Sequence, residues 1–415
     1  MNEFTPVPQS LDRPDDSAAR LPGTMTERYP DLGTDPVPLS VNVDPAYFEL
    51  ERERIFRRSW LNVGRVDDIP NPGDYFVKEI DVLQTSVLVV RGQDGVIRAF
   101  HDQCRHRGNK VVRGGSGNCK NFTCGFHGWT YDTTGKLVNV PDEDQFFKFN
   151  KAELGLNALA ADVWEGFIFV NAQQQPEESL KEWIGELADE FEGWFSKDLT
   201  LIASYMVDVQ CNWKVFIDAF VEAYHAPFIH GRSVGDVFTS PENPFAHLAS
   251  ARLYKRHRSI SVWGKERPPS RAEEMAFRYG RKVWPAPGAP NEPLPRGINP
   301  EGHQKWAFDI NLIFPIFQLG IANGYYLIYN YWPLAVDRSK MEFKLYMYEP
   351  KTPGEYISQE YVRTLMRDVV REDLNTMEST QSTFLGGGNT HMYLSDQEIA
   401  VRHGYKVVQR MVEGL

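Results

Sequence analysis

The sequence is poor in cysteine, lacks long apolar runs and carries no excess of positive charge. Its 415 residues include four cysteines, and no stretch of about 18 uninterrupted apolar residues occurs, so we expect neither a disulfide scaffold nor a membrane span. The 45 basic residues are outnumbered by 56 acidic ones, which argues against a nucleic-acid partner. The N-terminus also lacks a basic segment followed by an apolar one, so we expect a soluble protein in the cytoplasm.

Hydrophobic periodicity divides the chain into three parts. Residues 1–40 carry seven prolines and no sustained apolar period, which predicts a loosely ordered, extended arm. Residues 41–173 begin with a helix at Asp44-Pro45 and continue with β-type segments, such as those on either side of Asp94-Gly95. This second part is expected to form a small all-β domain.

The period changes in the third part, residues 174–415. Apolar residues recur at three- and four-residue steps from Leu180 to Phe195, which predicts an amphipathic helix. Farther on, apolar and polar residues alternate from Met341 to Tyr348, as in a half-buried antiparallel strand. The pattern predicts an α+β domain and a boundary near residue 174.

Two cysteines and two histidines form a pair of short motifs. Cys104-Arg-His106 and Cys124-Gly-Phe-His127 are separated by 17 residues, so four ligands can lie on two facing loops. Thiolate and imidazole ligands suit a structural zinc knuckle or a Rieske iron–sulfur cluster. The surrounding glycines and aromatic residues favour the cluster, because they allow close backbone approach to sulfur and exclude water. Cys119 could compete as a ligand, but Cys124 is preferred because it shares a tight loop with His127. Cys119 and Cys211 are then expected to be small core or surface residues.

A second group of ligand-type residues lies between 218 and 230. Asp218, Glu222 and His225 stand at i, i+4 and i+7, so a helix would project two acids and an imidazole from one face. His230 is about 140° out of phase with His225 on a regular helix. Pro227 interrupts the helical hydrogen bonding and can turn both rings towards one ion. The alternative is a pair of ordinary core histidines.

Two imidazoles and one carboxylate form the facial triad of non-haem Fe(II) oxygenases. The carboxylate candidate is Asp373, which lies in the apolar stripe of a helix predicted between 357 and 384. A buried carboxylate needs a cation, and either iron or a neighbouring arginine, Arg367 or Arg371, would supply it. Glu222 is the alternative third ligand.

Together these motifs resemble the large (α) subunit of a Rieske non-haem iron oxygenase, the aromatic ring-hydroxylating family. The resemblance spans residues 45–410. It is carried by the two cysteine–histidine motifs, Asn212-Trp213-Lys214, Glu222-Ala-Tyr-His225 with His230, and Glu372-Asp373 followed by Gln381. It implies an α+β protein with an N-terminal all-β Rieske domain and a C-terminal helix-grip (START/Bet v 1-like) catalytic domain built on a curved antiparallel sheet.

The resemblance also implies cofactors, partners and residue roles. Cys104, His106, Cys124 and His127 would hold a [2Fe-2S] cluster, and His225, His230 and Asp373 a mononuclear Fe(II). Electrons would come from a ferredoxin, an NAD(P)H-dependent reductase or both. The chains would form a homotrimer, with or without a small β subunit, in which the cluster of one chain serves the iron of the next. Glu222 would bridge the two centres through His127, and Asp218 is a further candidate catalytic acid.

The expected enzyme uses dioxygen to hydroxylate an aromatic or other hydrophobic small molecule. Six phenylalanines are candidates for its substrate pocket: Phe216, Phe220, Phe228, Phe238, Phe245 and Phe317. Glu222 stands where most family members have aspartate, and glutamate occurs in a subset that includes amine-oxidising members. Dealkylation of a methylated amine is therefore the alternative activity, and a Rieske protein that only transfers electrons is the alternative outside the oxygenases.

Overall fold

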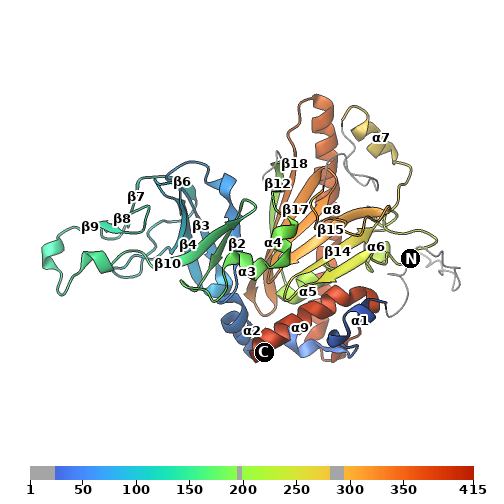
Figure 1. Ribbon diagram of the computed structural model, residues 1–415, viewed down its shortest axis with the longest axis horizontal. Coiled ribbons are helices and arrows are strands. Elements are labelled where there is room, and N and C mark those ends of the chain that lie inside the picture. The colour runs from blue at the N-terminus through green and yellow to red at the C-terminus, as the bar shows by residue number, and fades with distance from the viewer. Residues whose placement is uncertain (1–23, 194–198, 281–293) are drawn as a thin grey trace.

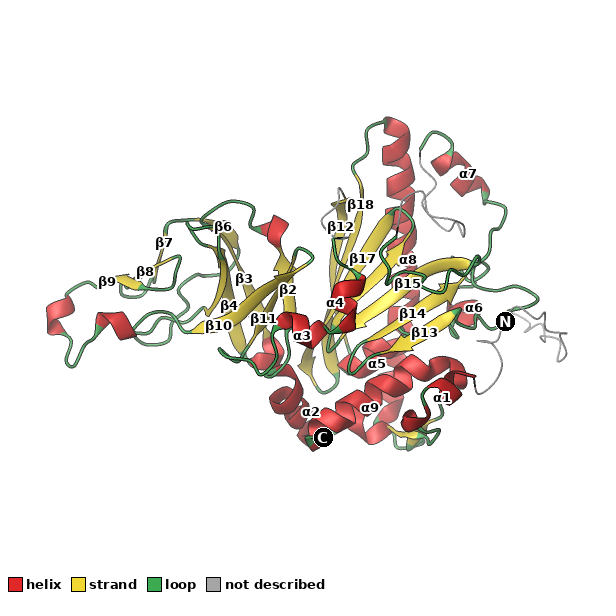
Figure 2. Cartoon of the chain, viewed as in Figure 1, coloured by secondary structure: helices red, strands yellow, loops and turns green. Residues whose placement is uncertain are grey.

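The computed structural model describes residues 24–193, 199–280 and 294–415. Within these residues two seven-stranded antiparallel sheets stand side by side, the first built from the N-terminal half of the chain and the second from the C-terminal half (Figure 1). Helices gather around the second sheet (Figure 2). The arrangement confirms the predicted fold class, an all-β domain followed by an α+β domain.

The first sheet forms the core of the N-terminal domain. Its strands, in spatial order, are β2 (Leu61–Arg65), β11 (Phe167–Asn171), β10 (Ala158–Trp164), β5 (Ile97–His101), β4 (Thr85–Arg91), β3 (Asp74–Ile80) and β6 (Ser116–Asn118). The predicted hairpin at Asp94-Gly95 joins β4 to β5, and Gly95 has a φ of 80° that suits glycine. A three-stranded sheet of β7 (Asn121–Thr123), β8 (Thr130–Asp132) and β9 (Leu137–Asn139) extends away from the second domain (Figure 1).

The second sheet is larger and carries the longest strands. Its spatial order is β12 (Leu199–Val209), β18 (Arg338–Tyr348), β17 (Tyr325–Ala335), β16 (Phe317–Ala322), β15 (Trp306–Ile313), β14 (Arg258–Trp263) and β13 (Ser250–Leu253). The predicted alternation is confirmed in β18, where Met341, Phe343 and Leu345 are buried and the intervening residues are half-buried. One face of every strand is therefore available to build a core or a cavity.

The helices are short except for two. They are α1 (Thr24–Arg28), α2 (Pro45–Glu51), α3 (Leu180–Ile184), α4 (Glu186–Glu190), α5 (Trp213–Asp218), α6 (Ala226–Ile229), α7 (Arg271–Phe277), α8 (Pro353–Phe384) and α9 (Ile399–Glu413). Asp44 caps α2 as predicted, accepting a hydrogen bond from the Ala46 amide at 2.8 Å. Of the helices in the described part of the chain, none is both long and apolar enough to cross a membrane.

Two local predictions differ from the structure. The single helix expected from Leu180 to Phe195 is broken into α3 and α4 by Gly185, whose φ of 63° ends the first segment, and Phe195 lies outside the described residues. Residues 1–23 of the predicted arm also lie outside them. Residues 24–40 are not loosely ordered, because Met25 is fully buried and the Thr26 amide donates a hydrogen bond to Asp396 at 2.8 Å.

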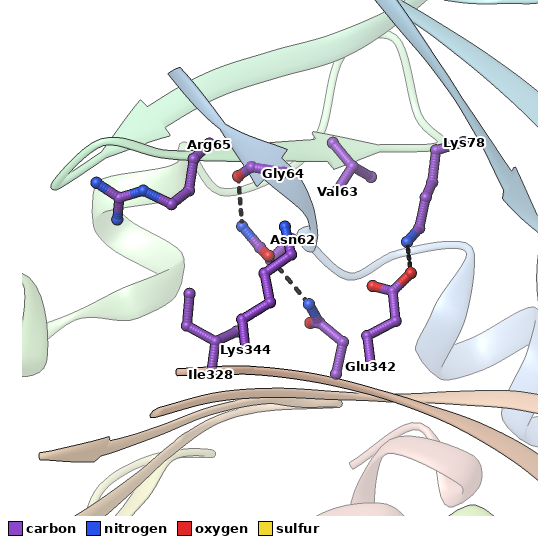
Figure 3. Close-up of a pocket in the computed structure, with 9 residues that line it drawn as sticks. Asn62, Val63, Gly64, Arg65, Lys78, Ile328, Glu342 and Lys344 are labelled. Carbon is purple, nitrogen blue, oxygen red and sulfur yellow. Dashed lines mark hydrogen bonds and ion pairs between the residues drawn. The ribbon is translucent and has the colours of Figure 1, made fainter. Parts of the chain in front are cut away.

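Polar contacts join the two sheets around a small cavity of about 60 Å³ (Figure 3). Lys78 of β3 forms an ion pair with Glu342 of β18. The Asn330 side chain of β17 donates a hydrogen bond to Asn62 of β2 at 3.2 Å, and Asn62 donates to the Gly64 carbonyl at 3.1 Å. These contacts hold the first domain against the outer side of the second sheet's β17 and β18.

Candidate active site

The two cysteine–histidine motifs form a pair of similar loops. The Cys104 amide donates to the Asn109 carbonyl and the Gly108 amide donates to the Cys104 carbonyl. The second loop repeats this pattern with Cys124, Trp129 and Gly128. Gly108 and Gly128 have φ values of 78° and 72°, which explains the glycine at each position. The sequence therefore builds two matching loops that face one another.

All four predicted cluster ligands point into the space between these loops. The Nδ1 atoms of His106 and His127 lie 3.2 Å apart, and Cys104 and Cys124 are both buried. The Tyr131 hydroxyl lies 3.3 Å from the Cys104 sulfur. Burial alone would raise the pKa of the Cys124 thiol, but hydrogen bonds from the backbone amides of Phe126 and His127 and the side chain of Asn109 more than offset it. The donor set fits a cluster that needs thiolates on one side and imidazoles on the other.

The remaining two thiols lie elsewhere. Cys119 is half-buried near Tyr75, and its pKa is raised by burial. Cys211 is completely buried, and burial together with nearby acids raises its pKa well above the usual range. Neither cysteine belongs to the two loops at residues 104–109 and 124–129, so their exclusion as ligands stays a prediction.

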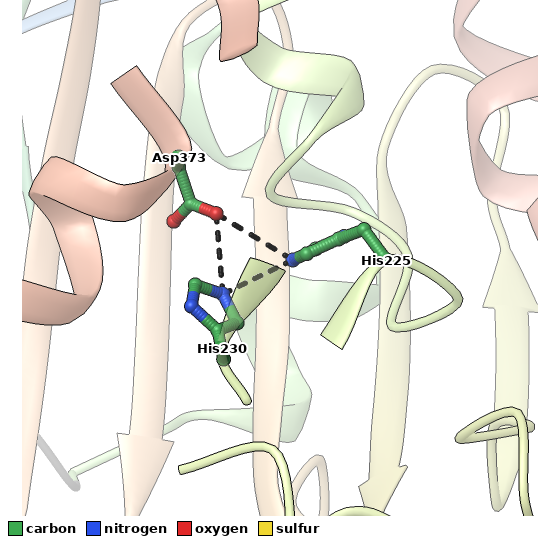
Figure 4. Close-up of side chains that lie close together, drawn as sticks. All are labelled: His225, His230 and Asp373. Atoms are coloured by element: carbon green, nitrogen blue, oxygen red, sulfur yellow. Dashed lines mark hydrogen bonds and ion pairs between the residues drawn. The ribbon is translucent and has the colours of Figure 1, made fainter. Parts of the chain in front are cut away.

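The second group of predicted ligands meets at the other end of the molecule, between the second sheet and α8. The Nε2 atoms of His225 and His230 are 3.3 Å apart, and Asp373 Oδ1 lies 3.6 Å and 3.1 Å from them (Figure 4). The three ligand atoms therefore converge on one point. His225 and His230 flank α6, a single turn with Pro227 in its first positions, and their rings meet beside it.

Asp373 reaches this point from the buried stripe of α8. Val370, Asp373 and Met377 are buried along this helix, and Asp373 is 3% exposed. The nearby arginine does not neutralise it, because Arg367 binds Asp368 at 2.8 Å. The Oδ1 atom of Asp373 is buried, and its polar neighbours are the Nε2 atoms of His225 and His230. A buried carboxylate oxygen that faces two imidazole nitrogens fits a metal ion.

A carboxylate holds the outer nitrogen of each imidazole. His225 Nδ1 contacts Glu222, and His230 Nδ1 lies 2.8 Å from Glu372 Oε2. Metal-binding histidines are usually oriented in this way, since the bond at one nitrogen fixes the other as the ligand. Burial opposes charge on His225, but the carboxylates of Glu222 and Asp373 outweigh it and raise its pKa to about 9. The site thus favours bound positive charge.

The predicted shared face of Asp218, Glu222 and His225 is wrong. α5 ends at Asp218, so residues 219–225 do not continue the helix. Asp218 instead points towards α9, where the Tyr405 hydroxyl donates to it at 2.8 Å, and burial raises its pKa to about 7. Asp218 does not line the cavity beside the histidines, so the structure does not support a direct catalytic role for it.

A cavity of about 100 Å³ opens beside the two histidines and Asp373. Its wall is mainly aromatic and aliphatic. Of the six predicted phenylalanines, Phe220 and Phe238 line it and four do not. Phe216 and Phe317 are core residues, Phe228 is 54% exposed, and Phe245 packs near Tyr224. These four were predicted from residue type alone, which does not distinguish a core ring from one facing a cavity.

Sequence reasoning missed most of the cavity wall. The additional apolar lining residues come from the second sheet and α8, and include Val262, Phe308, Ile310, Tyr325, Leu327, Tyr329, Met366, Val369 and Val370. The sequence feature that could have identified these residues is the strand pattern in 306–329, which places every second side chain on one face of the sheet. That periodicity cannot say which face encloses the cavity.

Two family descriptions match the chain in succession. Residues 59–154 match the Rieske [2Fe-2S] domain, and residues 196–414 match the ring-hydroxylating alpha subunit (catalytic domain). The chain belongs to the ring-hydroxylating alpha-subunit family. It is therefore an oxygenase component that uses a Rieske cluster and mononuclear iron. The zinc-knuckle interpretation is wrong because the cysteine–histidine motifs lie in the Rieske match, and the electron-carrier interpretation is wrong because residues 196–414 match the catalytic domain.

Relatives of known activity fall into two chemical groups. The oxygenase subunit of carnitine monooxygenase from Acinetobacter pittii is 26% identical over 339 residues, which cover 80% of this chain and 81% of that protein. The alpha subunit of benzene 1,2-dioxygenase from Pseudomonas putida is 35% identical over 233 residues, covering 54% of this chain and 50% of that protein. The family is thus shared by enzymes named for a quaternary amine and for an aromatic ring.

Solved structures show the same fold. A quaternary ammonium Rieske monooxygenase superposes with a TM-score of 0.71 at 21% identity, covering 90% of this chain and 94% of that one. Naphthalene 1,2-dioxygenase from Rhodococcus sp. superposes with the same TM-score at 23% identity, covering 94% of this chain and 97% of that one. At these identities the likeness supports the fold and not the substrate.

Proposed function

We propose that His225, His230 and Asp373 hold the mononuclear iron and that Cys104, His106, Cys124 and His127 hold the [2Fe-2S] cluster. The observation that carries the first assignment is the convergence of the buried Asp373 Oδ1 with the Nε2 atoms of His225 and His230, at 3.6 Å and 3.1 Å. Iron bound there supplies open coordination positions for dioxygen. The protein holds the imidazoles through Glu222 and Glu372 and keeps the adjoining cavity apolar.

Substitution of the carboxylate tests this assignment. Asp373→Ala is expected to lose the mononuclear iron and oxygenase turnover while it keeps the cluster iron, the brown colour and the cluster EPR signal. Asp368→Ala is the matched control, because Asp368 is an exposed acid five residues earlier in α8. Full mononuclear iron occupancy in Asp373→Ala would refute the assignment.

Electron delivery is proposed to occur between chains of a homotrimer. The cluster loops and the iron-site residues lie at opposite ends of one chain (Figure 1), so a direct route within the chain is long. Glu222 contacts His225 at the iron site, and its side chain is 10% exposed. His127 lies on the loop between β7 and β8 of the N-terminal domain. A hydrogen bond from His127 of one chain to Glu222 of the partner subunit would shorten the route. A ferredoxin or an NAD(P)H-dependent reductase would reduce the cluster.

The bridging role of Glu222 predicts a specific defect. Glu222→Gln is expected to bind both metals and to slow oxidation of the reduced cluster in a single turnover with substrate present. Glu398→Gln provides a control for loss of one half-buried carboxylate in the same domain, since Glu398 accepts from the Ser395 amide at 2.8 Å and forms no hydrogen bond or ion pair with His225 among the described residues. An unchanged single-turnover rate in Glu222→Gln would exclude the bridge.

The proposed reaction is hydroxylation of an aromatic or other hydrophobic small molecule. Phe220, Phe238, Phe308 and the aliphatic residues around them form an apolar wall directly beside the iron-site residues. Burying an apolar ring in such a cavity is favourable, and the wall excludes water from the reacting centre. This wall is the observation that favours a hydrophobic substrate.

Oxidative dealkylation of a methylated amine is the second candidate. Its support is the similarity to carnitine monooxygenase over 80% of the chain, together with Glu222 and the tyrosines of the cavity. Aromatic faces attract quaternary ammonium groups. Incubation with labelled dioxygen and an electron donor separates the two reactions: a labelled phenol or diol supports ring hydroxylation, whereas formaldehyde or another aldehyde supports dealkylation.

A further inference from the structure

One polar side chain interrupts the apolar wall of the cavity away from the iron-site residues. Gln318 of β16 is 1% exposed and lines the cavity. Its Oε1 atom is buried and has no hydrogen-bond partner among the described residues. An acceptor left unpaired in this way destabilises the folded protein unless something else donates to it.

Buried polar groups on the adjacent strand β15 are satisfied within the protein. Asn311 of β15 accepts a hydrogen bond from the Ser259 hydroxyl at 2.7 Å. Asp309 accepts from the Trp306 indole at 2.7 Å and from the Asn299 amide at 2.7 Å. On β17 the Asn330 Oδ1 atom and the Tyr331 hydroxyl also have no partner among the described residues, but neither lines this cavity, whereas the unpaired acceptor of Gln318 does.

The sheet register places Gln318 near the iron-site segment. Gln318 lies directly opposite Tyr329 of β17, so both side chains stand on the same face of the sheet. The Tyr329 ring packs against Phe220 with centroids 5.2 Å apart, and Phe220 precedes Glu222 and His225 in the chain. Gly320, two residues beyond Gln318 on the same face of β16, also lines the cavity.

We propose that Gln318 determines substrate specificity by accepting a hydrogen bond from a hydroxyl or N–H group of an otherwise apolar substrate. That bond fixes one end of the molecule at β16 and turns the other end towards His225, His230 and Asp373. The inference rests on the proposed oxygenase site and adds a polar substituent to the substrate class. Gln318 does not touch the iron-site residues in any described contact, so it acts as a positioning residue.

Binding of matched probes tests the inference. The probes are phenol against toluene and 2-naphthol against 2-methylnaphthalene, which differ by a hydroxyl in place of a methyl group. Calorimetric titration of the fully loaded protein is expected to show about tenfold tighter binding of the hydroxyl member of at least one pair, about 1.4 kcal/mol. Gln318→Met is expected to remove that preference, because it keeps the approximate volume and loses the acceptor.

Two further variants make the result specific. Gln318→Glu retains an acceptor and is expected to retain the hydroxyl preference. Leu327→Met changes the same wall without changing its hydrogen bonding and is expected to affect both probes of a pair alike. The inference is overturned if wild-type protein prefers neither hydroxyl probe, or if Gln318→Met keeps the preference, as it would where a buried water satisfies the amide.

The same samples separate this inference from the oxygenase assignment. Calorimetry reports binding without turnover, whereas iron content and reductase-driven oxygen consumption report the metal site. Loss of the hydroxyl preference with unchanged iron content supports the role of Gln318. Absence of mononuclear iron from reconstituted wild-type protein would count against the proposed iron ligands, whereas a hydroxyl preference that Gln318→Met removes would still support the role of Gln318.

Discussion

The two iron-site histidines illustrate how single residues set the chemistry of a site. Each ring has one nitrogen directed at Asp373 and the other directed at a glutamate. An imidazole without such an outer partner can rotate or change tautomer, and either change would misdirect its free electron pair. Glu222 and Glu372 therefore belong to the site as much as the ligands themselves.

Replacement of Glu372 should weaken iron binding without removing a ligand. Its Oε2 accepts from His230 Nδ1 at 2.8 Å and from the Ser233 hydroxyl at 2.6 Å. Glu372→Gln removes the charge that makes His230 a stronger ligand, so we expect the affinity for Fe(II) to fall about 10- to 100-fold, measured by competition with a chelator. Glu360→Gln, an exposed acid on the same helix, should bind iron like wild type. Equal affinities in both variants would contradict this role.

The four cysteines should divide into two functional classes. Cys124→Ser is expected to abolish the cluster absorbance, because its loop supplies the amides that stabilise a thiolate. Cys119→Ser, five residues earlier, is expected to retain the full absorbance and cluster EPR signal, since Cys119 lies outside both ligand loops and its amide donates to the Gly73 carbonyl instead. A colourless Cys119→Ser protein that is otherwise folded would show that the ligand assignment is wrong.

At the scale of elements, long helices were predicted more accurately from the sequence than short ones. The stripe in α8 spans 32 residues, so its period placed Asp373 on the buried side correctly. The segment from 218 to 230 failed in part, because α5 ends at Asp218 and α6 is only four residues long. A helix extrapolated through such a break assigns faces that do not exist. The partner of Asp218, Tyr405, is 187 residues away, and no local pattern predicts that contact.

His257 joins three elements and should make stability depend on pH. Its Nε2 donates to the Trp183 carbonyl of α3 at 2.7 Å, and its Nδ1 accepts from the Phe314 amide beyond β15 at 2.9 Å. Burial lowers the pKa of His257 to about 3. The unfolded chain binds this proton near the ordinary value of about 6.5, so between these two values the unfolded state holds more protons.

The free energy of unfolding is therefore expected to decrease as the pH falls from about 6.5 towards 3. His257→Gln should be less stable than wild type at pH 7.5 but should lose less stability between pH 7.5 and 5, as measured by thermal unfolding midpoints. His391→Gln removes an exposed histidine and should keep the wild-type pH dependence. Parallel pH profiles for all three proteins would exclude His257 as a cause of acid sensitivity.

At the scale of the whole molecule, the N-terminal domain is tied to the catalytic domain by a buried ion pair as well as by the contacts around Asn62. Glu51 ends α2, and Lys214 lies in α5 directly before the iron-site segment. Lys214 Nζ lies 2.5 Å from Glu51 Oε1, and the Trp213 indole donates to Glu51 Oε2 at 2.9 Å. The side chains of Lys214 and Glu51 are 4% and 0% exposed.

Removal of one partner from this pair should be far more harmful than removal of both charges. Lys214→Met leaves Glu51 charged and buried, so we expect a loss of about 3–5 kcal/mol in the free energy of unfolding. Adding Glu51→Gln should restore much of that loss, because the amide oxygen still accepts from Trp213 and no charge stays buried.

Arg338→Met breaks an exposed pair with Asp208 and should cost less than about 1 kcal/mol. Denaturant unfolding followed at the cluster absorbance and at tryptophan fluorescence measures all three, and a double variant less stable than Lys214→Met would show that Glu51 is not the residue left unpaired.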